Sequence, residues 1–139
     1  MQATLPDSSF AGWGWGDSMK STEMVVFSAN GDSSSADAYF SSGHTEPELE
    51  PSLQSCYTTS KKSNADGTIT LTTSRPLDCG VDDSYVVELD KALSLITAWD
   101  GTSPTLKYHG DNKKGFTQYI GSDGTCTAAA PAVDPACTQ

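Results

Sequence analysis

The chain has 139 residues, enough for a single domain with one hydrophobic core. It carries 18 Asp and Glu residues against 8 Lys and Arg residues, a formal charge of −10, which argues against a nucleic-acid partner because such a surface repels phosphate groups. No apolar stretch approaches the roughly 20 residues of a membrane-spanning helix, and no charged-then-apolar leader opens the sequence. The acidity serves either solubility or docking with a basic partner.

Short apolar runs separated by turn residues predict an all-β fold, a sandwich or barrel of about eight strands. The first predicted strand covers residues 10–16. Because successive side chains of a strand point to opposite faces, Trp13 and Trp15 share one face there, and the glycines between them leave the other face bare. Residues 23–32 predict a second strand that ends in an Asn-Gly turn and returns along residues 34–40.

Residues 41–52 are expected to form a loop because two prolines interrupt regular pairing. A hairpin over residues 53–78 follows, centred on the turn at Asp66 and Gly67. Further strands are predicted at residues 83–90, 93–99, 105–110 and 115–121. The domain is therefore expected to cover residues 1–121, with a small-residue tail at 122–139.

Only nine residues precede the first predicted strand. A sandwich would normally pair that strand with an earlier one, so the sequence predicts either missing strands or an open sheet edge. A neighbouring copy could then supply a strand, which would give a homo-oligomer or a structural assembly.

Cys56, Cys79, Cys126 and Cys137 contain no C-x-x-C spacing, which argues against a zinc ribbon, a thioredoxin-type site and covalently attached haem. An even number of cysteines in a small Ser- and Thr-rich chain predicts two disulfides and an oxidising, extracellular compartment. Three connectivities remain open, and the most local one pairs Cys56 with Cys79 and Cys126 with Cys137.

Signatures of hydrolytic or transfer chemistry are missing from the sequence. It has no G-x-S-x-G elbow, no phosphate-binding glycine loop and no H-E-x-x-H pattern. Its acidic pairs lie in predicted loops, where carboxylates are normally solvated. The chain is therefore not expected to be an enzyme by itself.

Met19 lies in the polar turn GDSMKST and His109 in the short YHG segment. Each has an ordinary explanation, since a Met near a strand end usually packs and a lone His is usually a surface residue. Together with the strand that contains Trp13 and Trp15, however, Met19 and His109 suggest a haem site. A methionine sulfur and an imidazole nitrogen are a common axial pair for the haem iron of electron-transfer proteins, and glycines allow a porphyrin close to the backbone.

Five motifs, in order, resemble the DOMON superfamily over residues 10–121: GWGWGDSMKSTEMVVFSANGD, DAYFSSGHTEPELEP, TITLTTSRPLDCGVDDSY, LITAWDG and KYHGDNKKGF. The match is closest to its members that bind haem b, which include the cytochrome domain of fungal cellobiose dehydrogenase. The resemblance implies an immunoglobulin-like antiparallel β-sandwich with the haem at one end. It also implies that Met19 and His109 are the axial ligands of the iron.

The same resemblance places Arg75 near a haem propionate or in a structural role. Pairing with a nearby carboxylate, Asp78, Asp82 or Asp83, would satisfy this arginine equally well. Trp13, Trp15 and Tyr108 are expected to line the pocket.

The leading interpretation is a secreted b-type cytochrome that transfers single electrons, whose acidic surface steers a basic redox partner. Three alternatives stay open. His44 could replace Met19 as a ligand, although nothing local positions it. The sandwich could instead bind carbohydrate without haem, or act as a structural subunit of an extracellular assembly.

Overall fold

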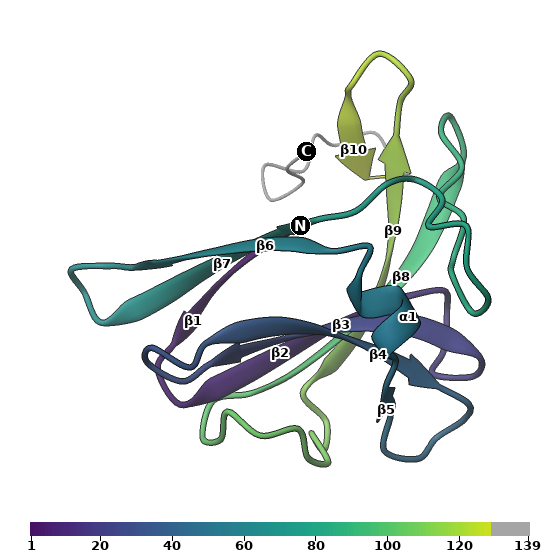
Figure 1. Ribbon diagram of the computed structural model, residues 1–139. Helices are drawn as coiled ribbons and strands as arrows, with labels where there is room; N and C mark the ends of the chain where they lie inside the picture. Colours follow the sequence, from purple (N-terminus) through teal and green to yellow (C-terminus); the bar gives the residue numbers. More distant parts are fainter. Residues whose placement is uncertain (129–139) are drawn as a thin grey trace.

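A computed structural model describes residues 1–128 as two antiparallel β-sheets that face each other, so the predicted all-β sandwich is confirmed (Figure 1). The smaller sheet has the order β1-β7-β6, and the larger has the order β10-β9-β8-β2-β3-β4-β5. The smaller sheet comprises β1 (Gln2–Pro6), β6 (Thr58–Ser63) and β7 (Thr68–Ser74). The larger comprises β2 (Ser9–Trp15), β3 (Thr22–Ala29), β4 (Ser35–Ser41), β5 (Glu48–Leu49), β8 (Ala92–Asp100), β9 (Lys113–Ile120) and β10 (Cys126–Ala128).

Two hairpins predicted from their turn residues are present. Strands β3 and β4 are joined at Gly31, whose φ of +53° is readily adopted by a residue without a Cβ. Strands β6 and β7 are joined through Gly67, with a φ of +87°, while the Asp66 carboxylate accepts the N–H of Thr68. Both turns are local in sequence, which is why the residues alone identify them.

Strand β2 is not at a sheet edge, so the predicted open edge beside it is wrong. It pairs with β3 on one side and β8 on the other. The residues before it form β1, which pairs with β7 in the smaller sheet. Within the described part of the chain, the larger sheet instead ends at β5 and β10.

Two further predicted strands are absent from the structure. Residues 83–90 are irregular: Asp83 and Asp90 have φ values of +65° and +60°, outside the β region. The predicted alternation of inward and outward side chains is nevertheless present, because Val87 is buried and Tyr85 and Leu89 are half-buried, while the residues between them are exposed. Residues 105–110 belong to the β8–β9 loop.

The expected loop at residues 41–52 contains β5 and the start of a short helix, α1 (Pro51–Gln54). Pro51 is tolerated at the first helical position because the N–H that it lacks would have no partner there. Glu50 caps this helix by accepting the N–H and the hydroxyl of Ser52.

The predicted disulfide between Cys56 and Cys79 is present. It joins Cys56, two residues after the end of α1, to the irregular segment that follows β7. The predicted pairing of Cys126 with Cys137 lies outside the described residues. Among residues 1–128, no helix combines the length and the apolar character needed to cross a membrane.

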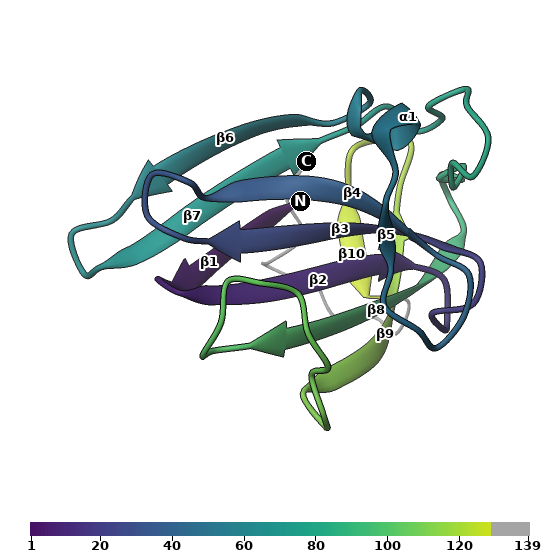
Figure 2. The same ribbon diagram turned by 60° about the horizontal axis from the view of Figure 1, so that its bottom comes forward.

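The buried side chains form two clusters. The first lies between the smaller sheet and strands β3 and β4, and includes Val25, Phe27 and Leu71. The second contains Trp15, Val87, Leu93 and Leu95, so it lies on the β2–β8 side of the larger sheet. Figure 2 shows that the smaller sheet lies over one side of the larger sheet and leaves β8 and β9 uncovered.

Candidate functional site

Trp13 and Trp15 share the inner face of β2, as predicted from their spacing. Their neighbours across the sheet are Val25 in β3 for Trp13 and Leu95 in β8 for Trp15. The two indole rings meet edge to face with centroids 6.3 Å apart. Trp13 also contacts Phe116 at 5.3 Å, and Trp15 stacks on Tyr85 at 5.6 Å. These aromatic side chains form the centre of the second cluster.

A buried ion pair lies beside this aromatic group. Arg75 Nη1 donates to Glu23 Oε2 at 2.6 Å, and the exposed fractions of the two side chains are 3% and 0%. The guanidinium also lies 5.7 Å from the centroid of the Trp15 ring. Buried charges must be paired and hydrogen-bonded, because moving each ion out of water costs on the order of several kcal/mol.

Further hydrogen bonds hold the irregular segment against the pair. Arg75 Nη2 donates to the backbone carbonyl of Tyr85 at 2.5 Å, and Glu23 Oε1 accepts the N–H of Tyr85 at 2.8 Å. The hydroxyl of Tyr57 donates to the same carboxylate. Burial first, and then the charge of Glu23, raises the pKa of Tyr57 well above its ordinary value. Strand β3, the end of β7 and the segment around Tyr85 are thus joined at one carboxylate.

Glu23 is the residue of this site that sequence reasoning missed. Its position carries a signal, because it alternates with Val25 and Phe27 and must therefore share their inner face. A carboxylate at an inner position needs a buried partner. Arg75 is that partner, so its predicted pairing with Asp78, Asp82 or Asp83 is wrong.

The bare face formed by the glycines of β2 lies on the outer side of the larger sheet. Neighbouring side chains already occupy part of it, since a Cβ at Gly14 would lie 2.8 Å from Ile96 Cγ1 and 3.2 Å from Thr22 Cγ2. Gly14 therefore provides room for Ile96 of β8. The structure gives a packing reason for this glycine that needs no bound group.

Met19 lies in the turn between β2 and β3, next to the start of β8. The turn begins at Gly16, whose N–H bonds the carbonyl of Ser94, and it ends with the Thr22 hydroxyl on the carbonyl of Ser18. The Met19 side chain is half-buried. Its position follows directly from the β2–β3 hairpin.

His109 lies in the loop between β8 and β9, close to the end of β8. Its carbonyl accepts the N–H of Asn112, whose own carbonyl accepts the N–H of Trp99. The His109 ring is half-buried and lies 5.6 Å from the ring of Tyr108. Tyr108 is 84% exposed and lines no described cavity.

The structure does not bring Met19 and His109 together. Trp99 pairs with Ala11 at the beginning of β2, whereas Met19 follows Trp15 at its end. Four residues of strand separate Ala11 from Trp15, roughly 13 Å at about 3.3 Å per residue. Figure 2 shows the β2–β3 turn and the β8–β9 loop at opposite ends of the larger sheet. Joint ligation of one iron by Met19 and His109 stays a prediction of the sequence.

The indole N–H groups of the two tryptophans are buried. The indole N–H of Trp13 is buried without an acceptor in the described part of the chain, and that of Trp15 faces the Tyr57 hydroxyl without a well-aligned hydrogen bond. Within residues 1–128, no group of three or more His, Cys, Asp or Glu side chains is arranged to hold a metal ion.

Comparisons with known proteins support the fold. No family model matches the sequence, and no curated protein matches it. Among solved structures, the chain is similar to the cytochrome domain of cellobiose dehydrogenase from Myriococcum thermophilum, with a TM-score of 0.63. The alignment has 15% sequence identity and covers 96% of this chain and 67% of that domain. At this identity the similarity establishes a shared β-sandwich architecture.

Proposed function

We propose that this chain is a secreted electron-transfer module that binds a b-type haem. The observation that carries the proposal is the similarity of nearly the whole chain to a cytochrome domain. The disulfide between Cys56 and Cys79 is compatible with an oxidising extracellular compartment. A bound haem would supply reversible one-electron chemistry at its iron.

Met19 and His109 follow opposite ends of the antiparallel strands β2 and β8, so the proposal does not rest on their joint ligation of the iron. Arg75 does not fit a propionate, since its guanidinium is buried against Glu23 and Tyr85. The buried indole N–H groups of Trp13 and Trp15 both lack a hydrogen-bond acceptor among the described residues. The proposal therefore concerns haem binding by the fold and assigns no ligand pair.

Titration of the purified chain with haemin tests the proposal. We expect one haem to bind per chain and to give a sharp Soret band that free haemin lacks. Met19→Leu and His109→Ala are compared separately, because a shared iron would lose its low-spin spectrum in both variants. Loss in one variant alone would assign a single protein ligand.

A titration in which the spectrum stays that of free haemin would contradict the proposal. His44→Ala is the matched control for His109→Ala, since it removes the second of the two histidines. A loss of the low-spin spectrum in His44→Ala, with Met19→Leu unchanged, would instead support ligation by two imidazoles.

A second candidate function is carbohydrate binding without haem. The observation that favours it is the exposure of two aromatic rings near one end of the larger sheet, with Trp99 at 41% and Tyr108 at 84%. Flat exposed aromatic rings can stack on the apolar face of a sugar. Retention of the haem-free chain on a glycan column, lost in Trp99→Ala and Tyr108→Ala, would support this function.

A further inference from the structure

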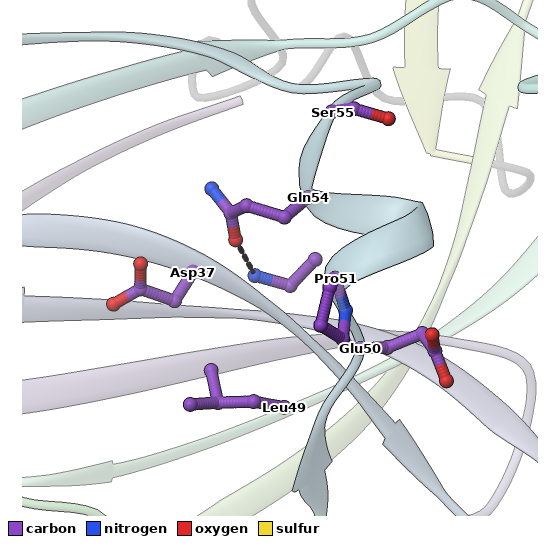
Figure 3. A pocket seen from close by; sticks show the side chains of 7 residues that line it. Asp37, Leu49, Glu50, Pro51, Gln54 and Ser55 are labelled. Carbon is purple, nitrogen blue, oxygen red and sulfur yellow. Dashed lines mark hydrogen bonds between the residues drawn. The ribbon is translucent and has the colours of Figure 1, made fainter.

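A groove of about 470 Å³ opens at the β5 edge of the larger sheet, away from the tryptophan cluster (Figure 3). Its lining is largely apolar, and Ala38, Leu49 and Pro51 contribute to it. Leu49 is 62% exposed and lies between Pro47 and Pro51. The groove therefore exposes apolar surface that nothing in the described part of the chain covers.

The polar residues of the groove lie at its rim. Gln54 closes the edge of β4, since its Oε1 accepts the N–H of Ala38 at 2.6 Å and its Nε2 donates to the carbonyl of Ala36. Asp37 lines the groove from β4, and its carboxylate and that of Glu50 point in opposite directions (Figure 3). Asp37 Oδ2 accepts the hydroxyl of Ser35, whereas Oδ1 has no hydrogen bond among the described residues. Asp37 thus retains an oxygen for an external donor.

The charge around the groove has one sign. Residues 33–60 contain four carboxylates, Asp37, Glu46, Glu48 and Glu50, and no lysine or arginine. None of the four forms an ion pair within residues 1–128. Burial, and then the charges of Asp37 and Glu46, raise the pKa of Tyr39 on the same strand. An apolar groove with unpaired acids complements a side chain that has an apolar stem and a positive end.

We propose that this groove binds a basic segment of a partner protein through a lysine or arginine side chain. The aliphatic stem of that side chain lies against Leu49 and Pro51, and its cationic end meets the Asp37 carboxylate. Long basic side chains commonly bury their stems in this way while the charge stays near water. The inference does not depend on haem binding.

Recognition through a side chain fits this edge better than the addition of a strand. Strand β5 has two residues and lies between Pro47 and Pro51, which offer no N–H to a new neighbour. The adjoining edge of β4 is closed by Gln54 and by the N–H of Glu50, which donates to the carbonyl of Ala38. Little backbone is left there for a partner strand to pair with.

The test uses a capped pentapeptide, acetyl-Gly-Leu-Lys-Leu-Gly-amide, and the same peptide with norleucine in place of lysine. Norleucine keeps the stem and removes the charge. Binding to the full chain is followed by amide chemical shifts in two-dimensional NMR. We expect the lysine peptide to shift the amides of Ala38, Leu49 and Gln54, and the norleucine peptide to bind about fivefold more weakly.

Three variants separate a built site from general attraction to an acidic protein. Asp37→Asn and Leu49→Ser should each weaken binding of the lysine peptide about fivefold, while Asp111→Asn, which removes an exposed acid in the β8–β9 loop, should leave it unchanged. Both groove positions are at least partly exposed, so both variants should fold. Equal weakening by Asp111→Asn, or shifts spread over all acidic residues, would overturn the proposal.

Discussion

The inner face of the larger sheet is covered in two different ways. Over β3 and β4, the smaller sheet packs small and aliphatic side chains such as Val25, Ala38 and Leu71 into the first cluster. Near β2 and β8, an irregular segment containing Val87 covers the tryptophans instead. That segment is attached by a disulfide at Cys79 and by hydrogen bonds at the Glu23–Arg75 pair.

The half of the molecule over β3 and β4 and the half near β2 and β8 are therefore ordered by different interactions. In the first half, the backbone N–H and C=O groups of neighbouring strands bond to one another. Apolar contacts between the two sheets are therefore enough to hold this half together. The irregular segment lacks such pairing and depends on specific polar partners. We therefore expect the second half to be more sensitive to single polar substitutions than the first.

Removing the buried carboxylate should have the largest effect. Glu23→Gln leaves the Arg75 charge buried without a counter-ion, and we expect the free energy of unfolding to fall by about 3–5 kcal/mol. Urea unfolding measures this loss. Glu46→Gln is the exposed control and should change stability by less than about 0.5 kcal/mol.

Replacing both ends of the ion pair sharpens the same test. Glu23→Leu combined with Arg75→Met removes both buried charges, and should recover much of the stability lost in Glu23→Gln. A double variant less stable than Glu23→Gln would mean that shape, and not unpaired charge, dominates at this site.

Removing the disulfide should have the next largest effect. Cys56→Ser combined with Cys79→Ser opens a loop with a sequence separation of 23, and we expect a loss of about 3 kcal/mol because the unfolded chain gains freedom. Hydrogen exchange measured on the same variant should accelerate at Val87 before it does at Val25. Equal acceleration in both clusters would contradict the division into two halves.

The outer face of β2 gives a smaller prediction with a matched control. Gly14→Ala brings a Cβ to 2.8 Å from Ile96 Cγ1, and we expect a loss of about 1–3 kcal/mol from overpacking. Gly12→Ala meets nothing closer than 3.8 Å and should be tolerated. Adding Ile96→Val to Gly14→Ala should restore part of the stability, as thermal unfolding would report.

Removal of the Tyr57 hydroxyl should have the smallest effect on stability. At neutral pH, we expect Tyr57→Phe to lower the free energy of unfolding by about 1–2 kcal/mol. The folded protein raises the pKa of Tyr57 above its ordinary value of 10.0. Its contribution is therefore fully present below pH 10 and declines as the pH rises further, because the unfolded state releases this proton first. Between pH 8 and pH 11, the free energy of unfolding should decline less steeply in Tyr57→Phe than in the unchanged protein. Parallel curves would exclude this role for Tyr57.

Local features were predictable where neighbouring residues determine them. Gly31 and Gly67 identified two hairpins, and the spacing of Trp13 and Trp15 identified their shared inner face. The alternation at residues 83–90 predicted the inward side chains Tyr85 and Val87 correctly, but it does not belong to a paired strand. Pairing needs a neighbour with free backbone groups, which periodicity alone does not reveal.

The all-β class and both hairpins depend on residue type or on short-range turn geometry, so the residues alone were enough to predict them. The pairing of Cys56 with Cys79 was one of three open connectivities, and the structure shows it. Only the tertiary structure decided that Arg75 meets Glu23, 52 positions away, and that β8 lies next to β2. The order of strands in a sheet depends on contacts between distant segments. The antiparallel pairing of β2 with β8 places Met19 and His109 beyond opposite ends of these strands, although their motifs follow one another in the sequence as the resemblance implies.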